Sequence, residues 1–337
     1  MLNINLIREQ LLNVENFNPE ILELIENNNW LNIWVPKQYN GLGLRFSEGL
    51  KTLQSIAKID GSLGWFVTLC SGANYFSRNL KPEIAHKLFS SQKTCFGGSG
   101  MLGGTAEKIG ENYIINGLWD YATGAPYLTH FTLNAKIIED GNEVLDHNHE
   151  PQFLSFILDK SQVNLISTWK SMGMIATSSH SFEVKNQKVH KDHSFIYNEF
   201  YSDDLVEKIP FRVFADLTLL VNYLGMAEHF LEKSLESFTS TLQDDFQNYL
   251  NKCSDKTLIY SAEIESLLQK NQSISEELTE EIHAFGTKVV EQITHYIIQI
   301  YPQLGIKASK LNDEINQVFR DYFTATQHRN FRINILP

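Results

Sequence analysis

The spacing of apolar residues along the chain changes twice. Up to about residue 92, apolar residues recur every three or four positions, as in Leu50, Leu53 and Ile56, which predicts helices. The segment Asn18-Pro19-Glu20 predicts a helix start, because Asn is a common cap and Pro suits the first helical position. We expect further helices to begin near Ser47 and Pro82, and a mostly buried helix over residues 61–78.

From Thr94 onward the period becomes two, which is typical of strands. Within this region Asn116-Gly117 predicts a tight turn between two short strands, since Asn-Gly suits positive φ at both central residues. Several short strands with turn signals favour a small barrel or sandwich. The expected strands cover residues 94–98, 112–116, 118–122, 130–137, 153–158, 162–167, 180–185 and 187–190.

After Pro210 the spacing is helical again, over residues 211–240, 257–270, 276–300 and 310–328, which favours an antiparallel bundle. Residues 240–275 look polar and abbreviated. Gly225 interrupts the first of these runs, and close helix contact, a cofactor or plain tolerance would each explain it. We therefore expect a helical domain over residues 1–92, a β domain over 93–205 and a helical bundle over 206–337.

Composition narrows the class of protein. The 337 residues carry a net charge of −12 with no long basic run, which argues against nucleic acid and against an acidic membrane surface. No apolar stretch approaches the ~20 residues that span a bilayer, and the first residues lack a signal-peptide pattern. The scattered Cys70, Cys95 and Cys253 indicate neither disulfides nor a metal site. A cytoplasmic location is the simplest expectation.

Five short motifs are spread over most of the chain. They are the loop 35–44, the turn Ile59-Asp60-Gly61-Ser62, the segment Trp119-Asp120-Tyr121-Ala122-Thr123-Gly124, the turn 172–179 and the pair Arg320-Asp321. In this order the motifs resemble those of the acyl-CoA dehydrogenase superfamily. The resemblance implies an α+β multidomain fold with an N-terminal helical domain, a middle β-barrel or sandwich and a C-terminal helical bundle. It also implies a flavin, FAD or FMN, between the middle domain and the bundle of a homodimer or homotetramer.

The resemblance gives several residues a place beside the flavin. Thr123 would bond near its reactive nitrogen, the backbone of Gly124 would approach it closely, and Trp119 would pack nearby. Hydroxyls and amides of a turn also form a local anion nest, and the turn Thr177-Ser178-Ser179 would lie near the cofactor. Without the resemblance, the same residues are equally well a core tryptophan, a turn threonine and a strand entrance.

The last helix separates the branches of the superfamily. Where dehydrogenases carry a catalytic glutamate after the Arg-Asp pair, this chain has Tyr322 to Arg329 without one. The chain there resembles the flavin-dependent monooxygenases, which take reduced flavin from a separate reductase and act with oxygen on a small organic substrate. That branch implies catalytic roles for His328 and Thr123, and a substrate pocket that includes Met172, Phe323 and Trp119. As a plain helix-terminal residue, His328 would instead be favoured by the helix dipole.

Two other functions stay open. One is an acyl-CoA dehydrogenase with a relocated base, for which Asp216 is the candidate near the position of a second family glutamate. A one-residue offset on a helix turns a side chain by about 100°, which makes Asp216 a poor substitute. The other is a non-catalytic protein that kept the fold after losing the flavin.

Overall fold

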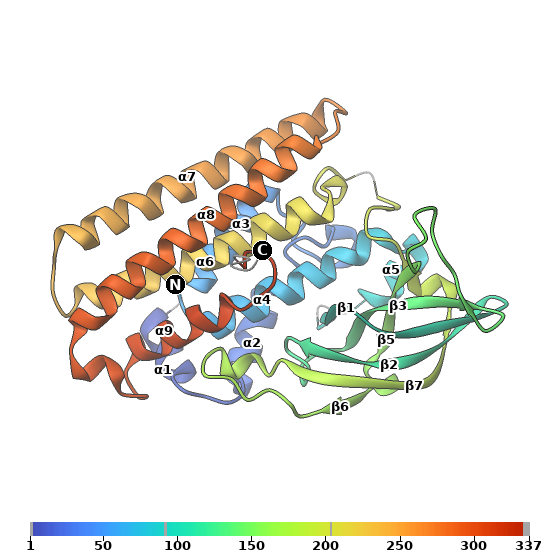
Figure 1. The fold of residues 1–337 in the computed structure, drawn as a ribbon, viewed down its shortest axis with the longest axis horizontal. Coiled ribbons are helices and arrows are strands. Elements are labelled where there is room, and N and C mark those ends of the chain that lie inside the picture. Colours follow the sequence, from blue (N-terminus) through green and yellow to red (C-terminus); the bar gives the residue numbers. More distant parts are fainter. Residues whose placement is uncertain (1–2, 91–92, 203, 333–337) are drawn as a thin grey trace.

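A computed structural model describes residues 3–90, 93–202 and 204–332. Helices come first, then strands, then a second set of helices, in the predicted order (Figure 1). The Asn18 side chain accepts a hydrogen bond from the Ile21 amide and so caps its helix as predicted, whereas Arg45, not Ser47, is the N-cap of the third helix. The first set is α1 (Ile4–Leu11), α2 (Pro19–Asn27), α3 (Phe46–Ala57), α4 (Gly61–Asn74) and α5 (Pro82–Leu88).

The strands form one mixed sheet in the order β6-β7-β2-β1-β3-β5-β8, with β4 beside β3. Strands β1 and β3 are parallel, and the other pairs are antiparallel. The strands are β1 (Phe96–Ile109), β2 (Asn112–Ala122), β3 (His130–Glu139), β4 (Asn142–Glu143), β5 (Phe153–Asp159), β6 (Asn164–Ile166), β7 (His180–His190) and β8 (Ser194–Phe195).

This sheet curls over an aromatic core. Tyr113 of β2 and Phe156 of β5 lie with ring centroids 5.1 Å apart, although β1 and β3 separate their strands in the sheet. In a flat sheet three strand spacings would amount to about 14 Å. The contact therefore requires the sheet to fold back on itself, which agrees with the predicted barrel or sandwich.

The predicted turn at Asn116-Gly117 is wrong, because both residues lie inside the uninterrupted strand β2. Gly117 is needed there for space: a Cβ atom would stand 2.6 Å from the Gly103 carbonyl oxygen and from the Trp119 ring. The Asn116 side chain accepts a hydrogen bond from the backbone amide of Asn186, where β7 bulges at a φ of 50°. The pair thus supports a bulge and an aromatic ring instead of a hairpin.

The second set of helices comprises α6 (Phe211–Leu235), α7 (Thr241–Gln269), α8 (Glu276–Ile300) and α9 (Glu314–Ala325). The three long ones form the upper part of the molecule in Figure 1, and the short last helix, α9, lies below them near α1. The expectation of an abbreviated segment over 240–275 is wrong, since α7 is a 29-residue helix. Its buried stripe, including Phe246, Leu250 and Cys253, is narrow, so most of its residues face solvent and are polar. Within the described residues no helix is both long and apolar enough to cross a bilayer.

Candidate active site

Three hydroxyl side chains form a continuous chain where the end of β2 meets the turn before β7. The Thr123 and Ser179 hydroxyl oxygens are 3.2 Å apart, those of Ser179 and Thr177 are 2.9 Å apart, and Thr177 lies 2.8 Å from the Met174 carbonyl oxygen. The amide of Gly124 donates to the Thr177 carbonyl at 2.7 Å, which fixes the two segments together. The structure therefore brings together four of the residues assigned to the flavin.

The direction of this hydroxyl chain follows from the proton count. A carbonyl oxygen can only accept a hydrogen bond, so the Thr177 hydroxyl donates its proton to the Met174 carbonyl. Ser179 must then donate to Thr177, and Thr123 must donate to Ser179. With its single proton used, the Thr123 oxygen keeps only acceptor capacity. The chain thus ends in an oxygen suited to receive a hydrogen bond from an N–H group.

Ser178 belongs to a different contact. Its hydroxyl lies 3.0 Å from the Asn16 side-chain oxygen, in the N-terminal segment, and its backbone has a φ of 44°. The same asparagine oxygen lies 3.4 Å from the Tyr127 hydroxyl. Ser178 therefore ties the turn to the N-terminal segment, and its hydroxyl is directed apart from the chain that ends at Thr123.

The predicted place for Trp119 beside the cofactor does not agree with its burial. The indole has no exposed surface, stacks on Phe182 with centroids 5.5 Å apart, and donates to the Asn134 carbonyl at 2.9 Å. It fills the interior of the sheet. Strand alternation would place Tyr121 on the same inner side, but β2 bulges between Trp119 and Ala122. Tyr121 takes a φ of 65° and is 66% exposed, so it presents an aromatic surface two residues before Thr123.

His328 lies just beyond α9 and is half-buried against α4. Its ring meets Trp65 edge-on, with centroids 5.4 Å apart, and burial lowers the pKa of His328. Nδ1 accepts from the Asn330 amide at 3.4 Å, so the neutral ring carries its proton on Nε2. The segment with Thr123 meets α4 at the next residue, Phe66. Gly124, which follows Thr123, lies so close that an added Cβ atom would stand 2.3 Å from the Phe66 ring. His328 and Thr123 thus approach neighbouring positions of one helix.

Met172 contacts α9, the helix to which Phe323 belongs, but the two residues do not enclose a common pocket with Trp119. Met172 is 54% exposed, and its carbonyl accepts from Arg320 at 2.5 Å. Phe323 packs on Phe319, with centroids 4.6 Å apart. Because the indole of Trp119 is enclosed in the sheet, the predicted pocket of these three residues is not formed among the described residues.

Three of the sequence motifs meet at one buried junction. The Asp321 carboxylate accepts from the Met174 amide at 2.5 Å, and its other oxygen would stand 2.8 Å from a Cβ on Gly61. Asp60 caps α4 by accepting from the Leu63 amide at 2.8 Å. Burial, reinforced by the charge of Asp60, raises the pKa of Asp321 well above its usual value, and burial raises the pKa of Asp60 to about 6. The junction joins α4, α9 and the turn of the sheet.

Asp216, the candidate base of a dehydrogenase, is already engaged in hydrogen bonds with other side chains of the chain. Asp216 is buried; its two carboxylate oxygens lie 3.2 Å from Nδ1 of His283, and one of them accepts from the side-chain Nδ2 of Asn330 at 2.7 Å. Burial raises the pKa of Asp216, while these hydrogen bonds lower it. Its partners lie on α8 and beyond α9, so Asp216 fastens the segment after α9 to the bundle.

Comparison with known proteins identifies the fold. No family model matches the chain. It is 26% identical to an indole-3-acetate monooxygenase of Pseudomonas putida, over 59% of this chain and 50% of the relative. It is 20% identical to the flavin-dependent monooxygenase oxygenase subunit HsaA of Mycobacterium tuberculosis, over 62% and 54%. The chain thus spans about half the length of these curated relatives.

The similarity to solved structures extends over nearly the whole chain. A 3-HSA hydroxylase from Rhodococcus matches with a TM-score of 0.88 at 15% identity, covering 98% of this chain and 91% of that one. XiaF from Streptomyces, in complex with FADH2, matches with 0.86 at 14%, covering 97% and 89%. TdsC from Paenibacillus, with FMN and indole, matches with 0.78 at 17%, covering 97% and 92%. The chain has the acyl-CoA dehydrogenase fold that these oxygenases share.

Proposed function

We propose that this chain is the oxygenase component of a flavin-dependent monooxygenase. It would receive reduced FAD or FMN from a separate reductase and insert one oxygen atom into a small organic substrate. The names of the relatives and the flavins in two neighbouring structures support this class. The single observation that carries the proposal is the directed hydroxyl chain that ends at Thr123.

The direction of the chain suits a reduced ring better than an oxidised one. A reduced flavin supplies the electrons that activate oxygen, and its central nitrogen carries a proton that the oxidised form lacks. Thr123 accepts a hydrogen bond from such an N–H group without disturbing its own bond to Ser179. To serve the oxidised ring, Thr123 would have to donate, which would leave Ser179 without its donor. The exposed ring of Tyr121 adds an aromatic surface beside this acceptor.

His328 supplies the proton chemistry in this proposal. Its lowered pKa keeps the imidazole neutral at pH 7, and the hydrogen bond at Nδ1 leaves the Nε2 proton available. A neutral imidazole can donate from Nε2 to an oxygen atom of the reacting species, or regain a proton there, near neutral pH. Trp65 holds the ring edge-on, which limits its rotation.

The test compares the binding of reduced and oxidised flavin. FAD and FMN are reduced anaerobically and titrated into the purified protein, and the oxidised forms are titrated in parallel. We expect the reduced form to bind at least tenfold more tightly, and a reductase with NADH to support oxygenation of an aromatic substrate. Equal affinity for both forms would contradict the role given to Thr123. Bleaching of bound oxidised flavin by an acyl-CoA would select the dehydrogenase, and no flavin binding at all would select the non-catalytic alternative.

We also propose that the protein assembles as a homodimer or homotetramer. The long helices α7 and α8 form the outer edge of the molecule (Figure 1). They carry the exposed apolar residues Ile259 and Ile298, which are 58% and 51% exposed. Light scattering after gel filtration would give the mass in solution, and a monomeric mass at micromolar concentration would contradict this part of the proposal.

A further inference from the structure

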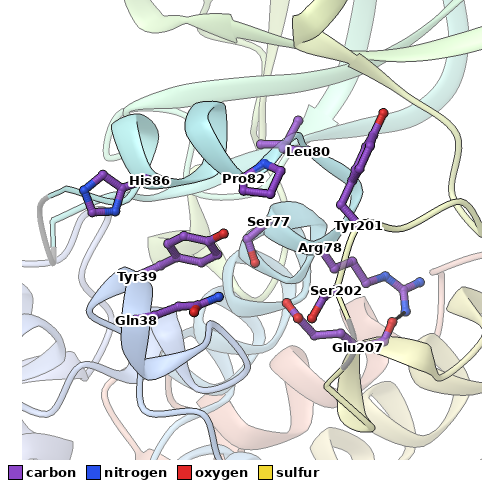
Figure 2. Close-up of a pocket in the computed structure, with 10 residues that line it drawn as sticks. All are labelled: Gln38, Tyr39, Ser77, Arg78, Leu80, Pro82, His86, Tyr201, Ser202 and Glu207. Carbon is purple, nitrogen blue, oxygen red and sulfur yellow. Dashed lines mark hydrogen bonds between the residues drawn. The ribbon is translucent and has the colours of Figure 1, made fainter.

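A cavity lies beyond the C-terminal end of α4 (Figure 2). Its volume is about 520 Å³, within the range of about 300–1,000 Å³ found for small-molecule pockets. It is formed by the turn Lys37–Tyr39, by the segment from Ser77 to His86, and by Tyr201, Ser202 and Glu207, which lie between the sheet and α6. Cys70, beside Thr123, and Ser77 are seven positions apart, roughly 10 Å along a helix axis. The cavity is therefore separate from the candidate flavin site.

The cavity is lined by a buried carboxylate whose oxygens make no hydrogen bond of ordinary geometry within the described residues. Glu207 is only 1% exposed, and neither of its carboxylate oxygens makes a hydrogen bond within the described part of the chain. The hydroxyl of Ser77, which is 2% exposed, is also without a hydrogen bond there. In Figure 2 both groups approach the same space, together with the side chains of Gln38 and Tyr39. The Ser202 and Ser77 hydroxyls lie near enough to Glu207 to lower its pKa, but neither makes a hydrogen bond of ordinary geometry to it. A buried carboxylate that is so weakly satisfied gains from a donor outside the chain.

The nearest cation cannot serve as that donor. Arg78 directs its guanidinium at backbone carbonyls, with bonds to Glu207, to Ile209 at 2.7 Å and to Tyr197 at 3.1 Å. It also donates to the Tyr75 hydroxyl at 2.6 Å and stacks over that ring at 4.0 Å. These contacts hold the chain between the sheet and α6 in place. Arg78 is thus committed to backbone carbonyls and to Tyr75, and the buried Glu207 side chain lies at the wall of the cavity.

We propose that this cavity binds a small organic amine, with its ammonium group at Glu207 and a compact apolar body beside it. An ammonium group has three donors, which match the two carboxylate oxygens of Glu207 and the hydroxyl of Ser77. Tyr39 and His86 meet edge-on with centroids 6.3 Å apart and provide an aromatic wall for the rest of the ligand. A single carboxylate is too few for a divalent metal ion, which prefers several oxygen ligands.

Binding should depend on pH through Glu207. Burial raises the pKa of Glu207 to about 7, so the carboxyl group is largely protonated at pH 6 and ionised at pH 8, while an alkylamine stays protonated throughout. We therefore expect affinity to rise from pH 6 to pH 8. The other charged or titratable groups that face the cavity or Glu207 are Tyr39, Arg78, His86, Tyr201 and Asp204.

The test uses benzylamine and phenethylamine as probes and benzyl alcohol as the uncharged match, in calorimetric titrations of the full chain without flavin. We expect saturable binding of an amine at pH 8, at least tenfold weaker binding at pH 6, and no binding of the alcohol. Glu207→Gln should weaken the amine at least tenfold. Glu199→Gln, an exposed glutamate on the same connecting segment, should leave it unchanged.

Several outcomes would overturn the proposal. These are the absence of saturable amine binding to the wild type, equal binding of amine and alcohol, and unchanged affinity in Glu207→Gln. Thermal melting shows whether Glu207→Gln is folded, and Ser77→Ala is the second variant if it is not. Ser77→Ala should weaken the amine several-fold, and unchanged affinity there would count against the proposal. Because no flavin is present, the result is independent of the function proposed for the first site.

Discussion

The proposed preference for reduced flavin depends on one atom, the hydroxyl oxygen of Thr123, as a hydrogen-bond acceptor. Thr123→Val keeps the shape of the side chain but removes both the acceptor and the donor to Ser179. A hydrogen bond of this kind contributes about 1–3 kcal/mol when its partner is charged or buried. We expect affinity for reduced flavin to fall about tenfold or more, measured by anaerobic titration, with a smaller change for the oxidised form.

Two variants control for this effect. Thr123→Ser keeps the hydroxyl and should retain most of the affinity. Thr218→Val removes a buried hydroxyl whose hydrogen bonds, among the described residues, go to carbonyls of α6, including that of Phe214 at 2.9 Å, and should leave flavin binding unchanged. Equal losses in Thr123→Val and Thr123→Ser would show that packing at this position, and not the hydroxyl oxygen, decides the affinity.

His328 should impose a pH dependence on turnover. Burial lowers the pKa of His328, so the neutral ring predominates above the ordinary histidine value of about 6.5 and is lost as the pH falls below the shifted value. Oxygenation that requires Nε2–H of a neutral ring should therefore be constant from pH 7 to 8 and decline on the acidic side. His328→Gln should lower turnover about 10²-fold and flatten this decline.

The matched control is His295→Gln on α8, where the histidine is exposed. Its turnover and pH profile should equal those of the wild type. An acidic decline that persists in His328→Gln would assign the dependence to another group. Steady-state oxygen consumption in the presence of reductase, corrected for the reductase alone, measures both quantities.

At the scale of elements, the contact between α3 and α6 explains Gly225. A Cβ at this position would stand 2.3 Å from the Gln54 carbonyl oxygen and 2.8 Å from Cβ of Ala57. Gly225→Ala should therefore push the helices apart and lower the free energy of unfolding by about 1–3 kcal/mol. Urea unfolding followed by circular dichroism measures this change.

Gly72→Ala on α4 is the control for glycine in a helix. The added Cβ would meet only the Phe214 ring, at an ordinary 3.7 Å. The substitution should raise stability by about 0.5–1 kcal/mol, because alanine loses less backbone entropy than glycine on folding. If both alanine variants shift stability in the same direction, close helix contact is not the reason for Gly225.

The sequence predicted an element correctly where its signal comes from neighbouring residues. It predicted wrongly where the conformation depends on residues of an adjacent strand. The cap at Asn18 and the change from helix to strand near Thr94 depend on neighbouring residues, and both are confirmed. Asn116-Gly117 has the composition of a turn, but the space needed by Trp119 between paired strands is invisible in sequence. For the same reason alternation predicts Tyr121 inside, whereas the bulge turns it outward.

For the whole molecule, the decisive feature is how distant motifs converge. The Asp-Gly-Ser turn, the Gly173-Met174 turn and the Arg320-Asp321 pair are far apart in sequence, yet they meet where α4, α9 and the sheet come together. A Cβ on Gly173 would stand 2.2 Å from the Arg320 carbonyl oxygen, and Gln317 donates to Asp60 at 2.8 Å. The motifs that suggested a cofactor thus serve in part to join the elements of the fold. The resemblance located them but could not show this role, because it says nothing of burial.

This junction makes stability depend on pH. The pKa of Asp60 is raised to about 6, and that of Asp321 is raised further, so the folded state binds protons more tightly than the unfolded chain. Stability from this pair is complete below about pH 4 and is lost as the pH rises through 6 and above. Asp321→Asn keeps an oxygen for the Met174 amide and removes a buried carboxyl group that must otherwise ionise as the pH rises. We expect it to melt several degrees higher than the wild type at pH 8, with the difference closing toward pH 5.

The exposed Asp255→Asn on α7 is the matched control and should shift the melting temperature little at either pH. Thermal unfolding followed by circular dichroism at both pH values measures the effect. If Asp321→Asn melts below the wild type at pH 8, then the ionised carboxylate is stabilised by the Met174 amide and the neighbouring Arg320 more than it is penalised by burial beside Asp60. Since the two explanations predict opposite signs at the same pH, one pair of melting curves decides between them.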